Sequence, residues 1–336
     1  MKDRRTVTLT GIKPTGELHL GNYAGAIRPL LALAADPGRD VLLFVADLHA
    51  LNAQPDPAAV AERTRRLAAA LLACGLDGPN VRLYRQSRVP AIARLTTLLG
   101  NVTSKGLLNR AHAYKAAVSA NVEAGRDPDH GVNAGLYGYP VLMAADILAF
   151  DADEVPVGTD QAQHLEITVD VAQAFARAYR PGVLREPRAL LPEDVPTLPG
   201  VDGRKMSKSY DNTIALMGER VQTARRIRRI VTDSATPAEP KEPDRCTLVA
   251  FLRVFAEPAT VREVETRYRE GGIGYGEVKT LLADVVEERV APLRERYARL
   301  LAEPAGLTDR LARDERDAAA RADAVLERTM TAMGLW

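Results

Sequence analysis

The chain has 336 residues, of which 46% are hydrophobic and 26% charged, and its formal net charge is +1. This composition is that of an ordinary globular protein with room for one large domain and a smaller one. A charge near zero argues against nucleic-acid binding by bulk positive charge, although a local basic patch remains open.

The N-terminal half alternates predicted strands and helices. Strands are expected at 7–10, 41–46 and 81–84, and helices at 23–34 and 57–74. The 41–46 run is apolar throughout, which is typical of a strand buried on both faces of a parallel sheet. The alternation predicts a doubly wound, Rossmann-type α/β domain, in which ligands bind beyond the carboxyl ends of the strands. The loops 11–16 and 47–49 both follow predicted strands and are expected at that site.

The segment 101–133 is polar and rich in turn residues, and 123–130 is expected to be an exposed insertion. Helices are predicted at 139–149, where Pro140 suits the first turn, and at 163–178. Beyond the loop that ends at Ser209 the pattern is almost wholly helical. Further helices are expected at 219–231, 247–256, 260–270, 275–302 and 309–333, with a linker at 232–244. We therefore predict a Rossmann-type catalytic domain at 1–209 and a helical anticodon-binding domain at 210–336, whose last helix packs back on the first domain.

A lysine-bearing loop, Arg204-Lys205-Met206-Ser207-Lys208-Ser209, follows a Pro- and Gly-rich stretch. Ammonium groups on flexible stems hold and release phosphate as point charges, and mobile loops are where such groups usually lie. Lysines in a surface loop are most often merely solvated, but the whole Lys-Met-Ser-Lys-Ser string is much rarer than its parts. It resembles the signature loop of class I aminoacyl-tRNA synthetases.

A second motif, His19-Leu20-Gly21-Asn22, stands at a predicted helix start, where free N–H groups and the helix dipole suit phosphates. Glycine lets a flat ring lie on the backbone. A Gly-Asn pair alone is usually a plain N-cap. Together with the lysine loop, in this order, it resembles the paired signatures of class I synthetases, with Asn22 in the form usual in the tryptophanyl branch.

The helix predicted at 139–149 carries Asp146 among apolar neighbours, with Met143 and Tyr139 on the same face. A buried carboxylate needs a partner, and an indole N–H, which only donates, is one candidate. Pairing within the fold is the other. Met143 is an adaptable apolar wall for a ring.

The string Met-Ala-Ala-Asp-Ile-Leu at 143–148, followed by Val-Pro-Val-Gly at 155–158 and Asp160-Gln161, resembles bacterial tryptophanyl-tRNA synthetases. The resemblance extends through 231–234 to the last helix and is weakest at 101–133. It implies activation of L-tryptophan by ATP with Mg²⁺, followed by transfer to tRNA(Trp).

The resemblance also implies roles for individual residues. Asp146 accepts the indole N–H, and Tyr139 with Gln161 fixes the amino group. The other residues expected to bind tryptophan are Met143, Val155, Val157, Leu9 and His49. The residues expected to bind ATP are Lys13, Pro14, Thr15, Gly21, Asn22, Gly158, Thr159, Asp160, Leu198, Lys205, Met206, Ser207, Lys208 and Ser209. Catalysis is assigned to Lys205, Lys208, Lys13 and Lys115, without a general base.

Two positions depart from the family pattern. Lys13 stands where most relatives carry Gln, and Thr159 replaces an acidic residue. Both changes make the site more positive, so we expect tighter binding of ATP or of the substrate carboxylate, and altered sensitivity to inhibitors that mimic the substrate.

The arginine run at 225–229 is interpreted as a solvated helix face or as a contact to tRNA phosphates. Arg110 and His112 are candidates for the acceptor stem. The family further implies a homodimer. Two alternatives stay open: a tyrosyl-tRNA synthetase, and a synthetase-like paralogue that binds tryptophan and a protein partner without charging tRNA and has an auxiliary role in inhibitor resistance or biosynthesis.

The two cysteines, Cys74 and Cys246, lie far apart, so neither a Cys-x-x-Cys zinc site nor a cysteine-ligated iron–sulfur cluster is expected. They fit a reducing cytoplasm. The charged N-terminus lacks the apolar stretch of a signal peptide, and no apolar run is long enough to span a bilayer. We therefore expect a cytoplasmic enzyme without a membrane partner.

Overall fold

The computed structural model describes residues 4–53, 55–158, 162–191 and 197–335. Its described strands form one five-stranded sheet in the order β3-β2-β1-β4-β5, with every pair parallel. The strands are β1 (Thr6–Ile12), β2 (Arg39–Val45), β3 (Val81–Arg85), β4 (Glu154–Pro156) and β5 (Arg188–Leu190). The strand order reverses between β1 and β4, so the predicted doubly wound sheet is confirmed and its switch point lies between these two strands.

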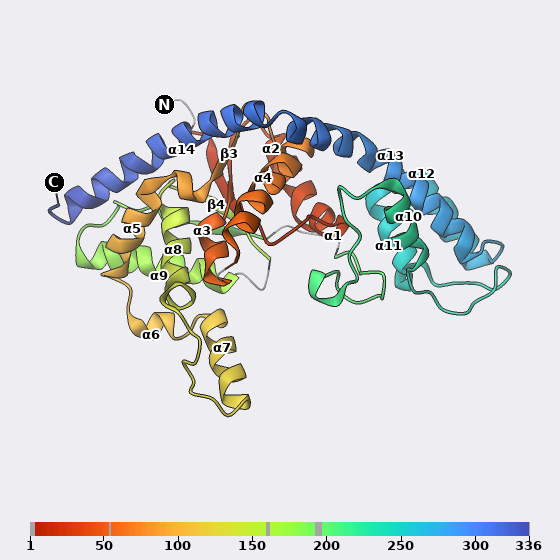
Figure 1. The fold of residues 1–336 in the computed structure, drawn as a ribbon, viewed down its shortest axis with the longest axis horizontal. Coiled ribbons are helices and arrows are strands. Elements are labelled where there is room, and N and C mark those ends of the chain that lie inside the picture. The colour runs from red at the N-terminus through yellow and green to blue at the C-terminus, as the bar shows by residue number, and fades with distance from the viewer. Residues whose placement is uncertain (1–3, 54, 159–161, 192–196, 336) are drawn as a thin grey trace.

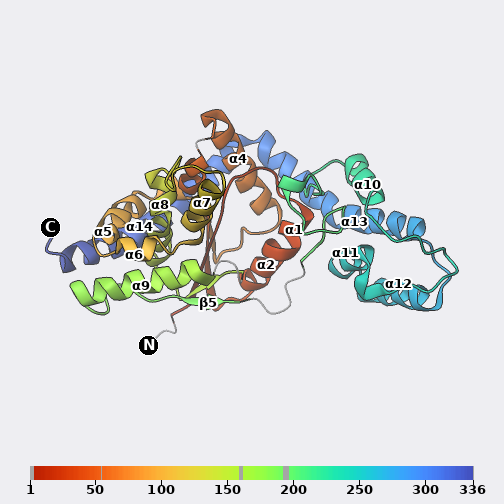
Figure 2. The same ribbon diagram turned by 90° about the horizontal axis from the view of Figure 1, so that it is seen from below.

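Helices cover both faces of the sheet (Figures 1 and 2). The helices that surround the sheet are α2 (Arg28–Ala34), α4 (Pro57–Ala73), α5 (Pro90–Gly100), α8 (Ala134–Leu148) and α9 (Ala162–Ala178). Side chains of β2 alternate between two apolar clusters: Leu43 and Val45 pack with α2 and α4, whereas Leu42 and Phe44 pack with α5 and α8. Burial on both faces explains why this strand is apolar at successive positions.

The helix predicted at 23–34 is interrupted near its start. It consists of α1 (Leu20–Asn22), a π-helical turn η1 (Tyr23–Ile27) and then α2. Hydrophobic periodicity does not distinguish such a turn from α-helix, and π-turns are frequent at functional sites.

Pro140 corrects one expectation. It lies inside α8 rather than in its first turn, because the helix begins at Ala134, where Asn133 caps it by accepting a hydrogen bond from the Leu136 N–H at 2.8 Å. Proline lacks an N–H, so the carbonyl of residue 136 loses its helical donor. The break lies one residue from Tyr139, in the part of α8 that faces the predicted amino-acid pocket.

The chain after the lysine loop forms a separate helical layer, at the right of Figure 1. Its helices are α10 (Arg220–Arg228), α11 (Thr247–Phe255), α12 (Pro258–Glu270) and α13 (Tyr275–Ala302). This layer touches the sheet domain near the first signature: Tyr23 stacks on Phe255 with ring centres 5.8 Å apart.

The last helix, α14 (Pro304–Ala332), returns to the sheet domain and runs beside β3 and α5 (Figure 1). Ala318, Ala322 and Leu326 belong to the same apolar cluster as α5 and α8. Arg85 at the end of β3 donates to Glu315 of α14 at 2.5 Å. The last helix therefore packs beside the sheet, against β3 and α5.

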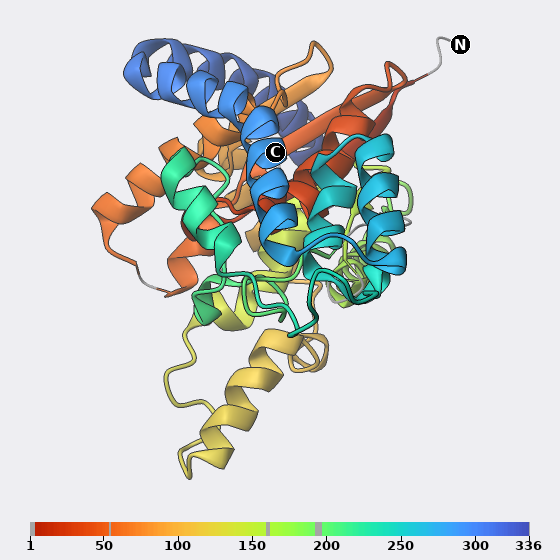
Figure 3. The ribbon, with the colours of Figure 1, turned by 90° about the vertical axis from the view of Figure 1, so that its right-hand side faces the viewer.

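An arm projects from the body, with α7 (His112–Glu123) at its tip (Figures 1 and 3). The segment 124–131 that follows α7 is exposed, which agrees with the predicted insertion. The remaining short elements are α3 (Asp47–Ala50), η2 (Leu51–Ala53), η3 (Gln86–Arg88), α6 (Lys105–Leu108), η5 (Lys208–Tyr210) and η6 (Pro243–Arg245). Within the described ranges, no helix is long and apolar enough to cross a membrane.

Candidate active site

A cavity of about 900 Å³ lies at the switch point, beyond β1 and β4. It is lined by ten residues expected to bind ATP: Thr15, Gly21, Asn22, Gly158, Leu198, Lys205, Met206, Ser207, Lys208 and Ser209. The two signature motifs, far apart in the sequence, thus face one cavity. Its size and polar lining suit a nucleotide.

His19 and Asn22 form a reciprocal cap at the start of α1. The Asn22 N–H donates to His19 Nδ1 at 3.2 Å, and the His19 N–H donates to Asn22 Oδ1 at 3.1 Å. Burial, with the nearby charge of Lys208, lowers the pKa of His19 from 6.5 to about 4. His19 is therefore neutral at physiological pH, with Nδ1 as acceptor. His19 also lines the cavity. It belongs to the first sequence motif, but the sequence assigned it no ligand.

Gly21 and Met206 join the two motifs. The Gly21 N–H lies 3.4 Å from Met206 Sδ, across 185 residues of sequence. A Cβ at Gly21 would come within 3.0 Å of His19 Nδ1 and 3.3 Å of Met206 Cβ. A side chain here would force His19 or Met206 to shift. Met206, which is buried, anchors the lysine loop against α1.

Asn212 holds the lysine loop in shape, and it is a site residue that sequence reasoning missed. Its Oδ1 accepts from the Ser207 N–H at 2.7 Å, and its Nδ2 donates to the Lys205 carbonyl and to Asp202 Oδ1. Asn212 is buried, and its side chain fills the space beside Gly200 where a Cβ would clash. An asparagine after a loop carries no periodic signal, so only the fold reveals it.

Lys208 lines the cavity, whereas Lys13 is not among its lining residues. The Lys13 ammonium lies 5.9 Å from the centre of the Tyr139 ring. Although part of Lys13 is exposed, exclusion of water lowers the pKa of its ammonium. Burial likewise lowers the pKa of Lys208, and the charge of Arg63 lowers it further while that of Glu17 opposes the change. Desolvated cations of this kind attract phosphate strongly.

Asp146 is completely buried and bound by two neighbours. Gln86 Nε2 donates to its two carboxylate oxygens at 2.8 and 2.9 Å, and His49 Nε2 lies 2.9 Å from Oδ2. Burial raises the pKa of Asp146, and the contacts to His49 and Gln86 oppose this change. A carboxylate accepts about four hydrogen bonds, so Oδ1 retains capacity for one more donor. Because the group is covered, a further donor could reach Oδ1 only if a neighbouring side chain moved.

The residues expected to line the amino-acid pocket are buried or pack on the core on one face of the sheet. Tyr139 is buried, its ring meets the His49 ring edge-on at 6.3 Å, and its hydroxyl bonds His164 Nε2. The buried side chains of Leu9, Val155 and Val157 belong to one apolar cluster, on which Met143 packs. Gln86 was not among the expected residues, because its link to Asp146 spans 60 positions.

Other expected site residues are not joined to the cavity. Thr159, Asp160 and Gln161 lie outside the described residues. Pro14 is buried, and Lys115 is exposed on the projecting α7 (Figure 3). The roles of these residues, like those of the other expected ligands, stay predictions. In the described part of the chain, no group of three or more His, Cys, Asp or Glu is arranged to hold a metal ion.

The fold and the cavity together define a class of protein. A doubly wound parallel sheet with a cavity at its switch point, lined by a capped Gly-Asn helix start and a lysine loop, is the architecture of a nucleotide-binding α/β protein. A helical layer follows the lysine loop, as expected from the sequence.

Comparisons with known proteins identify the family. Residues 1–291 match the family described as tRNA synthetases class I (W and Y). The tryptophan–tRNA ligase of Pseudomonas aeruginosa is 50% identical over 308 residues, which cover 90% of this chain and 68% of that relative. The tryptophan–tRNA ligase of Neisseria meningitidis is 43% identical over 328 residues, which cover 97% of each.

A solved structure is similar along the whole chain. The tryptophanyl-tRNA synthetase of Campylobacter jejuni, complexed with ADP and tryptophan, superposes with a TM-score of 0.88 at 35% identity and covers 98% of this chain and 100% of its own. The chain belongs to the class I tRNA synthetases for tryptophan and tyrosine. The resemblance to bacterial tryptophanyl-tRNA synthetases that the motifs indicated is confirmed.

Proposed function

We propose that the chain is a tryptophan–tRNA ligase, which converts L-tryptophan and ATP to tryptophanyl-adenylate and pyrophosphate and then transfers tryptophan to tRNA(Trp). The observation that carries this function is the cavity that both signature motifs line, and the buried carboxylate of Asp146 supports the choice of tryptophan as substrate. The identity to tryptophan–tRNA ligases along most of the chain supports the same assignment.

In the first step the tryptophan carboxylate attacks the α-phosphorus in line, and pyrophosphate leaves. This displacement needs positioning and charge stabilisation more than proton transfer. Lys205 and Lys208 neutralise the leaving group, while Lys13 and Thr15 hold the phosphates near the end of β1. Gly21, Asn22 and Gly158, which all line the cavity, support the adenosine. In the second step a terminal ribose hydroxyl of the tRNA attacks the adenylate.

Selectivity for tryptophan follows from Asp146. A buried acceptor left unpaired rejects phenylalanine, whose ring has no donor. Tyrosine carries a donor, so its exclusion depends on the apolar walls formed by Met143, Val155 and Val157. Asp146 therefore selects for a hydrogen-bond donor on the ring, and its neighbours select for the shape of the ring.

The test is ATP–pyrophosphate exchange with tryptophan, tyrosine and phenylalanine, followed by charging of tRNA(Trp). We expect exchange and charging with tryptophan alone. Asp146→Asn is expected to raise the KM for tryptophan at least tenfold and to leave the KM for ATP nearly unchanged. Exchange driven by tyrosine alone would overturn the assignment, and exchange without charging would instead support an auxiliary paralogue.

We infer that Mg²⁺ binds together with ATP, as the Mg–ATP complex. The described cavity lining supplies lysines, hydroxyls and backbone groups rather than carboxylates. This donor set fits an ion carried by the phosphate oxygens and not by a cluster of protein ligands. Titration of exchange activity with Mg²⁺ at fixed ATP is expected to follow the concentration of the Mg–ATP complex.

We also propose the two-part organisation at 1–209 and 210–336, a homodimer and a cytoplasmic location. Cys74 and Cys246 are both free, which fits a reducing compartment. Family membership supports the dimer, and sedimentation at several protein concentrations tests it. The packing of α14 on β3 supports an organisation in which the last helix of the second domain packs against the first domain.

The arginine run at 225–229 is interpreted as a solvated helix face or as a contact to tRNA phosphates, and its residues differ in their surroundings. Arg226 donates to Asp211 at 2.6 Å, and Ile227 is buried, so these two residues are structural. Arg225, Arg228 and Arg229 remain candidates for tRNA phosphates. If they bind tRNA, neutralising them will reduce the salt dependence of tRNA affinity.

A further inference from the structure

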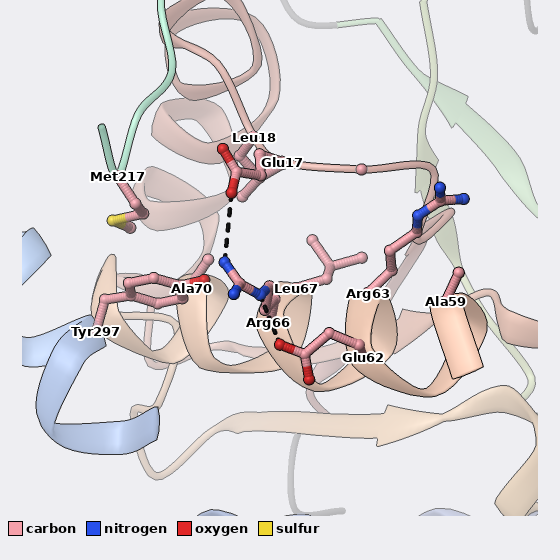
Figure 4. Close-up of a pocket in the computed structure, with 11 residues that line it drawn as sticks. Glu17, Leu18, Ala59, Glu62, Arg63, Arg66, Leu67, Ala70, Met217 and Tyr297 are labelled. Carbon is pink, nitrogen blue, oxygen red and sulfur yellow. Dashed lines mark hydrogen bonds and ion pairs between the residues drawn. The ribbon is translucent and has the colours of Figure 1, made fainter. Parts of the chain in front are cut away.

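A second pocket, of about 290 Å³, lies between α4, the loop after β1 and α13 (Figure 4). Gly16 lines this pocket. Lys208, which lines the larger cavity, lies against the same glycine, since its Nζ would be 3.2 Å from a Cβ there. The φ of Gly16 is +131°, a conformation that favours glycine. The two pockets therefore meet at Gly16, beside the ammonium of Lys208.

The carboxylates of this second pocket are already paired. Arg66 donates to Glu62 at 2.7 Å and lies 3.4 Å from Glu17, as the dashed lines in Figure 4 show. Arg65 also pairs with Glu62, at 2.8 Å. The Arg63 guanidinium is turned away from Glu62 and Arg66, and among the described residues it makes no ion pair.

Two cations without an ion-pair partner among the described residues thus adjoin Gly16: Arg63 lines the same pocket as this glycine, and Lys208 lies against it. The charge of Arg63 reaches Lys208 and lowers the pKa of its ammonium, although Glu17 acts in the opposite direction. The charge of Lys208 in turn contributes to the low pKa of His19. Like charges kept together at the edge of a ligand cavity are stabilised by an anion placed between them.

We propose that Arg63 and Lys208 form a subsite, at Gly16, for the terminal phosphate of ATP and hence for the leaving pyrophosphate. This inference rests on the proposed function. As a tryptophan carboxylate oxygen bonds to the α-phosphorus, the bond from that phosphorus to the bridging oxygen breaks, and pyrophosphate leaves with the electron pair. Negative charge grows on the departing group, so a guanidinium beside Lys208 stabilises it more than the ground state.

The test compares Arg63→Gln with Arg65→Gln. Both variants remove one positive charge from α4, but Arg65 pairs with Glu62 and does not line the pocket at Gly16. In the reverse reaction, from tryptophanyl-adenylate and pyrophosphate, Arg63→Gln is expected to raise the KM for pyrophosphate about tenfold. The KM for tryptophan in exchange should stay within about twofold, and Arg63→Lys should recover part of the loss.

Equal KM values for pyrophosphate in Arg63→Gln and Arg65→Gln would overturn the proposal. So would a loss that raises the KM for tryptophan as much as that for pyrophosphate, because this would mark a purely structural role. Calorimetric titration of pyrophosphate into the wild type and Arg63→Gln separates this inference from the function itself. A protein that binds pyrophosphate through Arg63 and does not activate tryptophan would retain the subsite and refute the ligase.

Discussion

Gln86 Nε2 donates to both carboxylate oxygens of Asp146, at 2.8 and 2.9 Å, while Gln86 Oε1 accepts from the backbone N–H groups of Leu48 and His49. One amide side chain therefore ties the end of β2 to α8. It orients the carboxylate proposed to recognise the indole and leaves Oδ1 room for a further donor.

We predict that Gln86→Ala weakens tryptophan recognition and stability together. The substitution leaves a buried carboxylate with one partner fewer and the His49 N–H unpaired, whereas the Leu48 N–H keeps Asp47 Oδ1 as an acceptor. We expect a cost of about 1–3 kcal/mol. We expect the KM for tryptophan to rise about tenfold with little change in the KM for ATP, measured by exchange.

Gln173→Ala, which removes an exposed contact to Glu186, is the control and should behave like the wild type. A normal KM for tryptophan in Gln86→Ala would show that Asp146 needs no such orientation.

A second prediction concerns Asn212, which we regard as a positioning residue. Asn212→Ala frees the Ser207 N–H and the Lys205 carbonyl, so the lysine loop loses its closed shape. We expect kcat of tryptophan activation to fall about tenfold or more while the KM for tryptophan stays unchanged. Asn101→Ala, which removes only a bond to the carbonyl of Thr97 in its own helix, is the control. A loss of thermal stability with normal kcat would contradict a role in positioning.

A third prediction is a pH dependence that His19 imposes on stability. Its pKa is about 4 in the folded protein and 6.5 without burial, so the unfolded chain binds the proton first as pH falls. The His19 contribution is therefore present above pH 6.5 and is lost progressively between pH 6.5 and 4. His19→Asn, which keeps a capping acceptor but does not titrate, is expected to flatten the fall of the free energy of unfolding across this window. Parallel curves for the two proteins, from denaturant unfolding at several pH values, would refute this assignment.

A fourth prediction concerns Lys13. Its ammonium is partly dehydrated and faces the Tyr139 ring, so removing the charge weakens attraction for the substrate carboxylate or the α-phosphate. We expect Lys13→Gln to raise the KM for ATP or tryptophan several-fold and to change the response to inhibitors that mimic the adenylate. Lys279→Gln, in α13 and bonded only to the Arg228 carbonyl, serves as the control. Unchanged Michaelis constants and unchanged inhibition would remove Lys13 from the site.

Local sequence patterns predicted the main elements because they record burial directly. The apolar run of β2, the alternation of strands and helices, and the helical layer after the lysine loop all follow from periodicity, and the structure contains them. Patterns failed where a special backbone state was involved. The π-turn at Tyr23–Ile27 and the interior position of Pro140 have the same hydrophobic spacing as ordinary helix.

The sequence by itself determined which motifs the chain carries, since the lysine loop, the Gly-Asn helix start and Asp146 are all readable from it, and they predict phosphate handling and a hydrogen-bond acceptor for the substrate. Only the tertiary structure decided which other side chains hold these groups in place. The contacts of Gly21 with Met206, of Gln86 with Asp146 and of Asn212 with the lysine loop depend on strand order and on how the loops close. Periodicity measures burial along one element, whereas these contacts join elements through space, so it carries no information about them.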